Sequence, residues 1–208
     1  PFNYTFVNFA ILPALFLITS YVGKKTKSKY RKKPFYSNLF LVGLSFGFGF
    51  FLSGNFWISY SLTFDESFKY LIPFSLILIP LFLGIYFGLG TLIAGTFIQN
   101  NFTSILFFSS SLAFIDFLRS KMLTGFPWNL WAYSWSWFPE SLQILNPIGI
   151  FAFNLITLTI FLSPLLLIFK KKFYNKFIFF FLFSIFFTNF LYGSYVINND
   201  NKKYDKLE

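Results

Sequence analysis

Long uncharged stretches run through the sequence and are separated by short polar or basic segments. Asp, Glu, Lys and Arg do not occur in residues 2–22, 34–64, 70–115, 141–169 or 177–198. The third stretch is long enough for more than one span, and polar residues at positions 99–101 divide it. Because a helix needs about 20 mainly apolar residues to cross a bilayer, the pattern predicts six transmembrane helices. We place them at residues 2–22, 37–62, 71–98, 102–122, 141–169 and 177–198.

The composition indicates that the solvent of this chain is lipid. Of its 208 residues, 56% are hydrophobic, 26% are aromatic and 12% are charged. An ordinary globular chain is about 25% charged, and a soluble body of this size could not bury so many apolar side chains. The expected fold class is therefore all-α, a polytopic transmembrane helical bundle over residues 1–198.

Most of the positive charge lies in two loops, and their positions predict the topology. Seventeen Lys and Arg oppose seven Asp and Glu, and the basic residues gather in 24–33 and 170–176. Four predicted spans separate the two loops, so both lie on one side, which the positive-inside rule assigns to the cytoplasm. The tail after Asn199 then lies outside. Residues 24–33 border a span and hold a single aromatic residue, Tyr30. We therefore interpret them as a topological anchor or an anionic-lipid contact, with no role in binding nucleic acid.

The sequence lacks the residue types that most enzymes need for catalysis. It contains no Cys and no His, which removes thiolate chemistry, the commonest general base and the commonest metal ligands. We expect no metal and no cofactor. Because the chain begins at Pro1 and its single Met is Met122, we expect it to be a fragment. The polar residues 199–208 are interpreted as a linker.

Two charges near the outer end of the fourth predicted span are candidates for function. Asp116 and Arg119 are three residues apart, so they share a helix face and are able to pair. A charge at the bilayer centre costs about 2.5–3.5 kcal/mol on insertion scales, which makes an idle pair improbable. Two interpretations stay open at this point: an ion pair that pins the helix to its neighbours, or a site that holds a polar lipid headgroup.

An aromatic segment follows this pair directly. Four of the five Trp fall between residues 128 and 137, and Gly125 and Pro127 indicate a tight turn before them. Trp and Tyr favour the headgroup level, so an aromatic belt is one explanation. A shaped turn beside a charged pair favours a surface that handles lipid. The candidate substrate-binding residues are Asn55, Trp57, Asp116, Arg119, Gly125, Phe126, Pro127, Trp128 and Tyr133.

Small and polar residues within the spans predict helix packing. Gly43 and Gly47 in the second span, and Gly84 and Gly88 in the third, are spaced to let another backbone approach. Ser45, Gly49 and Ser53 form a second row at the same spacing. Asn154 lies near the middle of the fifth span, and we expect it to hydrogen-bond to a neighbouring helix.

Three motifs resemble the membrane domain of bacterial apolipoprotein N-acyltransferases. The first is Leu-Thr-Gly-Phe-Pro-Trp at 123–128, preceded by Phe-Leu-Arg at 117–119 and followed by Tyr133-Ser134. The second is the glycine-rich segment 47–58, and the third is Asn-Pro-Ile-Gly at 146–149, which leads to Asn154. The similarity runs in order over nearly the whole chain. Asp116 stands where the family often has Glu.

The resemblance implies a function and a place in a larger enzyme. In that family, eight spans accompany a periplasmic nitrilase-like domain, and the enzyme transfers a phospholipid acyl chain to the N-terminal diacylglyceryl-cysteine of a lipoprotein. This chain would be spans two to seven in the inner membrane, with residues 199–208 leading to the catalytic domain. The family's catalytic Glu, Lys and Cys have no counterpart here, so we expect the fragment alone to be inactive.

The same resemblance assigns expected roles to the candidate residues. Residues 125–128 would form the lip of a lateral entrance, Trp57 and Tyr133 its walls, and Arg119 would steer a phosphate. The expected partners are the phospholipid acyl donor, the diacylated apolipoprotein and the lipid bilayer. Two other classes stay open from the sequence: a six-span substrate-capture subunit or small membrane transporter, and a purely structural membrane partner.

Overall fold

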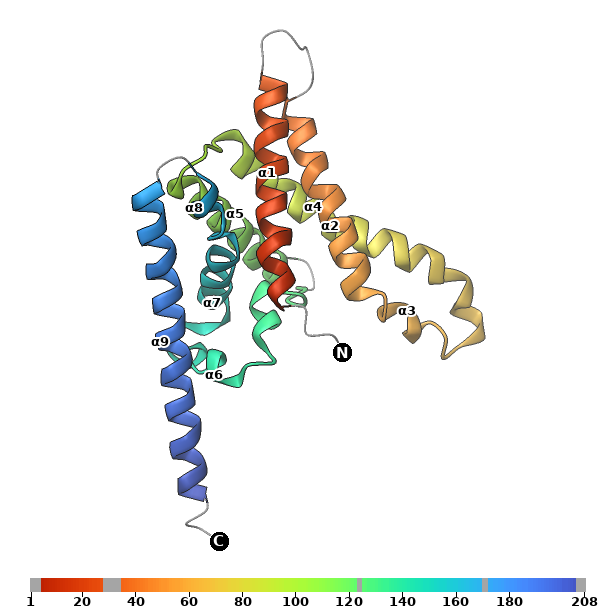
Figure 1. Ribbon diagram of the computed structural model, residues 1–208. Helices are drawn as coiled ribbons and strands as arrows, with labels where there is room; N and C mark the ends of the chain where they lie inside the picture. Colours follow the sequence, from red (N-terminus) through yellow and green to blue (C-terminus); the bar gives the residue numbers. More distant parts are fainter. Residues whose placement is uncertain (1–4, 28–34, 123–124, 170–171, 205–208) are drawn as a thin grey trace.

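The computed structural model describes residues 5–27, 35–122, 125–169 and 172–204, and the regular structure within these ranges is helical. Within these described ranges, six segments are long and apolar enough to cross a membrane, which confirms the all-α class (Figure 1). The long helices are α1 (Asn8–Lys27), α2 (Phe35–Asn55), α4 (Ile72–Thr96), α5 (Phe102–Lys121), α7 (Leu145–Leu162) and α9 (Lys172–Tyr204). The short ones are η1 (Thr5–Val7), α3 (Ile58–Ser61), η2 (Glu66–Leu71), η3 (Trp131–Trp135), α6 (Pro139–Leu142) and α8 (Leu165–Ile168).

Four predicted spans differ from the helices by several residues at one or both ends. The first, 2–22, corresponds to η1 and α1, which continue to Lys27. The span 37–62 ends as a helix at Asn55, and α3 follows as a separate turn. The span 141–169 starts at Leu145 and is kinked at Gly149, whose φ of 74° is one that glycine adopts at no steric cost. Helix α9 continues through Tyr204, because residues 199–204 contain no Gly or Pro to end it. Part of the predicted linker is thus helical, and residues 205–208 lie outside the described ranges.

Helices α2 and α4 form a close pair through the glycines that the sequence singles out. A Cβ atom added at Gly43 would lie 2.3 Å from the carbonyl oxygen of Phe87, and one at Gly47 would lie 2.8 Å from the Cα of Gly84. The Thr91 hydroxyl donates a hydrogen bond of 2.9 Å across the pair to the carbonyl oxygen of Leu39. The backbones approach this closely because glycine has no side chain to hold them apart.

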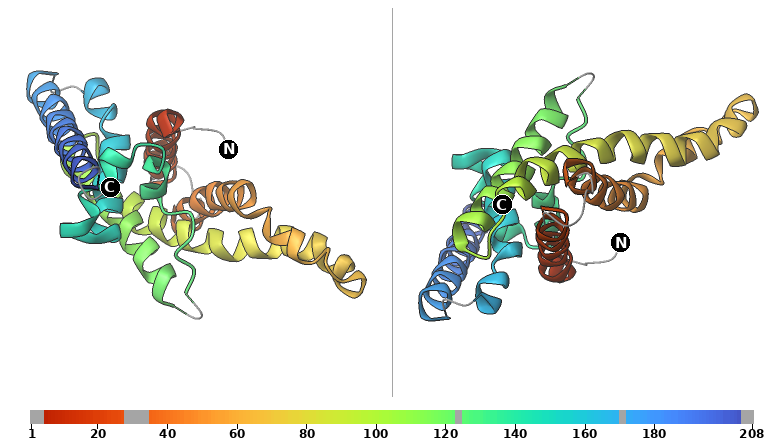
Figure 2. Two further views of the ribbon diagram at one scale, coloured as in Figure 1. Left: turned by 90° about the horizontal axis from the view of Figure 1, so that it is seen from below. Right: turned by 90° about the horizontal axis from the view of Figure 1, so that it is seen from above.

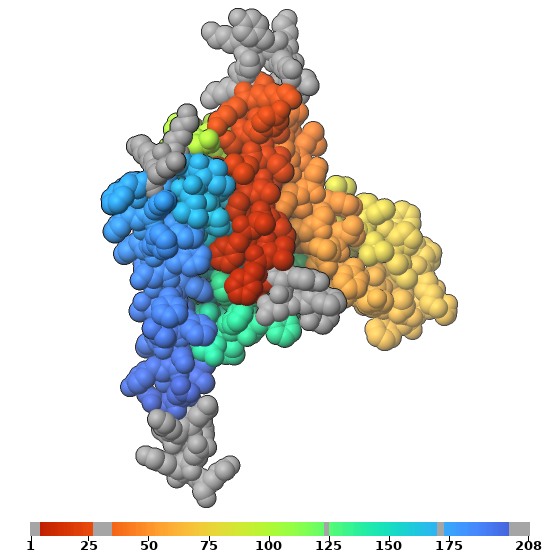
Figure 3. Space-filling model, viewed as in Figure 1, coloured from red at the N-terminus to blue at the C-terminus, as the bar shows by residue number. Residues whose placement is uncertain are grey.

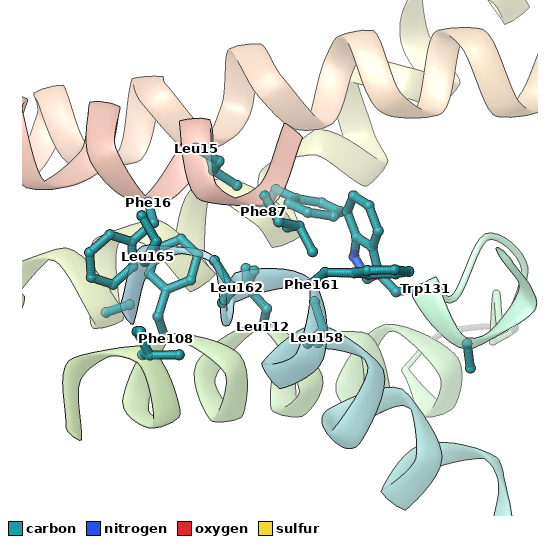
Figure 4. Close-up of a cluster of buried hydrophobic side chains, with 14 of the residues drawn as sticks. Leu15, Phe16, Phe87, Phe108, Leu112, Trp131, Leu158, Phe161, Leu162 and Leu165 are labelled. Atoms are coloured by element: carbon teal, nitrogen blue, oxygen red, sulfur yellow. The ribbon is translucent and has the colours of Figure 1, made fainter. Parts of the chain in front are cut away.

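A buried apolar cluster lies among α1, α4, α5, α7 and α8 (Figure 4). Its members include Leu15, Phe16, Phe87, Phe108, Leu112, Trp131, Leu158, Phe161, Leu162 and Leu165. The N-terminal half of α4 leaves this cluster and projects outward together with α3 (Figure 2). The cluster therefore fixes the C-terminal half of α4, while the projecting half is free to border a cavity.

The helix ends next to the two basic loops lie at the same end of the molecule. The C-terminal end of α1, the turn between α4 and α5 and the N-terminal end of α9 gather there, opposite α3 and α6 (Figure 1). Lys24 Nζ donates a hydrogen bond of 3.1 Å to Asn100 Oδ1 in that turn. Loop residues 28–34 and 170–171 lie outside the described ranges. Which end faces the cytoplasm stays a prediction.

Candidate functional site

Arg119 joins the end of α5 to the loop that follows it. The side chain is buried, and its Nη2 lies 3.0 Å from Asp116 Oδ1, so the predicted ion pair forms. Its Nη1 donates hydrogen bonds to the carbonyl oxygens of Phe126 at 2.7 Å and Trp128 at 2.8 Å. A guanidinium offers several donors in a fixed plane. One buried charge therefore fixes the position of the aromatic loop.

The carboxylate of Asp116 extends this connection to α7. Its Oδ2 accepts a hydrogen bond of 3.0 Å from Asn154 Nδ2, and Asn154 Oδ1 accepts one of 3.0 Å from the backbone N–H of Ala132 in η3. The side chains of Asp116, Arg119 and Asn154 are all buried. The buried hydrogen bonds between these groups favour one arrangement of α5, α7 and the loop. Asn154 thus links α7 to α5, as the sequence predicts for a neighbouring helix. It also accepts a hydrogen bond from η3, and the sequence does not indicate this second contact.

The turn between α5 and the loop has the geometry that the Gly-Phe-Pro motif predicts. Gly125 has φ of 71°, and its N–H donates a hydrogen bond of 2.9 Å to the carbonyl oxygen of Met122. The N–H of Phe126 bonds the carbonyl oxygen of Arg119 at 3.1 Å. A Cβ atom at Gly125 would meet the carbonyl oxygen of Ser120 at 2.7 Å, so only glycine fits here. Residues 123–124 lie outside the described ranges.

Aromatic rings enclose the guanidinium of Arg119. Its Cζ lies 5.0 Å from the ring centroid of Phe51 and 5.9 Å from that of Phe126. Within the described part of the chain, its Nε has no hydrogen-bond partner. With both Nη atoms engaged, the geometry favours a positioning role for Arg119. The prediction that it steers a phosphate is left with the N–H of Nε and the second N–H of Nη2.

A second polar contact ties the loop to the end of α2. Asn129, with φ of 59°, donates from Nδ2 to Asn55 Oδ1 at 2.6 Å. The rings of Trp57 and Trp128 meet edge to face with centroids 6.3 Å apart, and the two side chains are 49% and 56% exposed. The sequence reasoning missed Asn129. Its signal was available, because asparagine after a turn tolerates positive φ better than most residues.

An apolar cavity of about 440 Å³ opens beside the turn, a volume within the usual range for small-molecule sites. Arg119, Gly125 and Phe126 line it, whereas the other six predicted binding residues do not. Pro127 and Tyr133 are exposed on the loop and in η3. The rest of the lining comes from α3, the projecting part of α4 and the end of α5: Ile58, Leu78, Ile79, Phe82, Leu83, Tyr86 and Met122. Such a cavity suits a hydrocarbon chain. In the described part of the molecule, no three His, Cys, Asp or Glu side chains are placed to hold a metal.

Comparison with known proteins assigns the family. The model of the apolipoprotein N-acyltransferase N-terminal domain matches residues 1–162. The chain belongs to the apolipoprotein N-acyltransferase family. The chain is 35% identical to the apolipoprotein N-acyltransferase of Rhodopseudomonas palustris over 129 residues, 62% of this chain and 24% of that protein. Against the enzyme of Bradyrhizobium diazoefficiens it is 34% identical over 169 residues, 81% of this chain and 30% of that protein.

The family match and the site coincide along the chain. The matched range ends at Leu162, the last residue of α7, and contains every candidate binding residue as well as Asn154. A further relative from Brucella melitensis is 30% identical over 169 residues, which cover 80% of this chain and 31% of that protein. The chain spans less than a third of the length of these apolipoprotein N-acyltransferases. It is a multi-pass membrane protein of an acyltransferase family.

Proposed function

We propose that this chain is the lipid-admitting membrane part of an apolipoprotein N-acyltransferase. A phospholipid acyl donor and a diacylated apolipoprotein enter it sideways from the outer leaflet of the inner membrane. Their headgroup ends are then presented to a catalytic domain outside the membrane. The observation that carries this proposal is the loop fixed by Arg119, which forms one wall of the 440 Å³ apolar cavity beside α4.

The cavity binds the acyl tail of the lipid, and the loop contacts its headgroup end. The cavity walls from α4 are apolar and accept a hydrocarbon tail, since Leu78, Ile79 and Phe82 line it. Phe126 and Gly125 form the lip where the tail meets the headgroup. The edge-to-face pair of Trp57 and Trp128 lies at the level that amphipathic aromatic rings prefer. Arg119 acts by holding this lip in place.

The chemistry of acyl transfer requires an activated nucleophile. The resemblance gives the family a cysteine nucleophile, and the 208 residues hold no Cys, so we place the nucleophile in a catalytic domain outside this chain. The role of this chain is then to bind and orient lipid, and its variants should alter acyl transfer through substrate access.

The test uses a substitution on α4 that fills the cavity and leaves the residues of the loop unchanged. The full-length protein is expressed in bacteria depleted of their own N-acyltransferase, and mass spectrometry reads the N-terminus of a reporter lipoprotein. Leu78 lines the cavity, and Leu81 lies one turn away on the same helix and does not line it. Leu78→Trp places an indole where the tail would lie, so we expect at least a tenfold loss of the third acyl chain. Leu81→Trp should transfer at the parent rate.

Two results would contradict the proposal. Equal activity of Leu78→Trp and Leu81→Trp, at equal membrane levels, would remove the cavity from the path of the lipid. A parent protein that leaves the reporter diacylated would contradict the acyltransferase function itself and favour a transporter or substrate-capture subunit.

A further inference from the structure

A second cavity lies on a different face of the molecule, between α1 and α2, which run side by side in Figure 3. Its volume is about 680 Å³, and none of its lining residues belongs to the site described above. The residues that line this α1–α2 groove include Tyr21, Lys25 and Thr26 of α1 and Asn38, Val42 and Phe46 of α2. The groove therefore offers a separate place for a ligand.

The polar lining is concentrated at the end of the groove that adjoins the basic loop. Lys25 Nζ lies 3.1 Å from Tyr21 OH and 5.2 Å from the centroid of that ring. Asn38 faces the same end from α2, and its amide makes no hydrogen bond within the described ranges. The Thr26 hydroxyl is already bonded to the carbonyl oxygen of Val22. An ammonium and an amide N–H thus remain for an anionic oxygen, and charge-assisted bonds of this kind are among the stronger ones.

From this polar end the groove continues into a hollow whose lining is mainly apolar. A neighbouring hollow of about 390 Å³ shares Ser45 and Phe46 with it and extends to Gly49 and Ser53. A Cβ atom at Gly49 would meet nothing within 4 Å, so the path is open there. From Asn38 to Gly49, α2 advances about 16 Å at 1.5 Å per residue. This is close to half of a hydrocarbon core of about 30 Å, the depth of one leaflet.

We propose that the α1–α2 groove binds an anionic phospholipid of the cytoplasmic leaflet. The headgroup phosphate lies at Lys25 and Asn38, and one acyl chain follows Val42 and Phe46 towards Gly49. The charge supports this occupant, because the groove ends beside the basic residues 24–33 and basic pockets between helices on the cytoplasmic side hold anionic headgroups. This site takes a resident lipid in the opposite leaflet from the proposed acyl donor and does not depend on acyl transfer.

The experiment measures lipid binding to the full-length protein by native mass spectrometry, with titrations of phosphatidylglycerol and phosphatidylcholine. We expect tighter binding of phosphatidylglycerol by the parent protein. Loss of one lysine near an anionic headgroup costs about fivefold in affinity, so Lys25→Gln should weaken phosphatidylglycerol binding by that factor. Lys176→Gln removes an exposed lysine on α9, away from the groove, and should leave it unchanged.

A second variant tests the acyl path separately from the charge. Gly49→Leu fills the open part of the groove, and a leucine within a helix is better tolerated than glycine. We expect it to weaken binding of phosphatidylglycerol while the protein keeps its thermal stability. Equal affinities for the parent, Lys25→Gln and Gly49→Leu would overturn the proposal. That result would assign the groove to another membrane helix or to bulk lipid.

Discussion

A single buried arginine decides the shape of the aromatic loop. Arg119 is 2% exposed, and its guanidinium donates three hydrogen bonds, to Asp116 and to the carbonyl oxygens of Phe126 and Trp128. An isolated charge at membrane depth is costly, and the paired carboxylate and the two carbonyl oxygens offset that cost. Lysine cannot replace this arrangement, because its ammonium is a compact point charge without a planar fork of donors.

Arg119→Lys should therefore loosen the loop while keeping the ion pair. The variant loses the forked contacts to the two carbonyl oxygens. Because hydrogen bonds to charged groups contribute about 1.5–3 kcal/mol each and two are lost, we expect the free energy of unfolding to fall by about 3–6 kcal/mol. Thermal unfolding of the purified full-length protein in detergent measures this. Lys121→Arg, two residues further on an exposed position of the same helix, is the matched control. A melting temperature equal to the parent's would show that the carbonyl contacts add no stability.

At the scale of the helix, α2 carries two rows of small residues with different neighbours. Gly43 and Gly47 face α4 at backbone contact, whereas Ser45 lines the α1–α2 groove and Gly49 lines the hollow next to it. Four-residue spacing of small residues predicts a close approach for both rows. The two rows look alike in sequence, and the position of the neighbouring helix separates them.

Alanine at Gly43 and alanine at Gly49 should affect the stability of the protein differently. At Gly43 the new Cβ atom would lie 2.1 Å from Thr91 Oγ1 and 2.3 Å from the carbonyl oxygen of Phe87. The backbone cannot yield cheaply, so Gly43→Ala should lower stability by about 1–3 kcal/mol. Gly49→Ala adds a methyl group in open space and removes the helix penalty of glycine, so stability should stay equal or rise by up to about 1 kcal/mol. Differential scanning fluorimetry of both variants checks this, and equal shifts would contradict the α2–α4 packing.

The elements that follow from local rules were predictable from the sequence. The six spans follow from apolar length, the turn at Gly125 follows from its Gly-Phe-Pro chemistry, and the pairing of Asp116 with Arg119 follows from helix periodicity. The contact of Asn129 with Asn55 joins residues 74 positions apart. No local rule brings such distant positions together, because their approach depends on how α2 and α5 each pack against α4.

The cavity beside α4 was also not predictable from the sequence, for a different physical reason. Leu78 and Phe82 look like any lipid-facing residues in a long apolar run. They line a cavity because the N-terminal half of α4 diverges from the bundle (Figure 2). The cavity thus depends on the angle between α4 and the rest of the bundle, and the hydropathy of the sequence does not predict that angle.

On the scale of the whole molecule, the aromatic loop and the helix ends next to the basic runs lie at opposite ends. The aromatic loop and α3 lie at one end, and the turn joining α4 to α5 lies at the other with the start of α9 (Figure 1). Phe64, 91% exposed, marks the first end, and Tyr174 on α9 marks the second. The basic runs adjoin the second end. The positive-inside rule therefore predicts that the lipid cavity opens to the outer leaflet and that the α1–α2 groove opens to the inner one.

Cysteine labelling of the full-length protein in bacteria with a permeable outer membrane tests this orientation. A membrane-impermeant maleimide should modify Phe64→Cys in intact cells and should modify Tyr174→Cys only after lysis. The parent protein without an introduced cysteine gives the background. Both sites are exposed at the protein surface, so a difference in labelling reports the side of the membrane. Labelling of Tyr174→Cys in intact cells, with Phe64→Cys protected, would invert the orientation. The phospholipid donor would then have to reach the cavity from the cytoplasmic leaflet, and the anionic lipid of the groove would lie in the outer one.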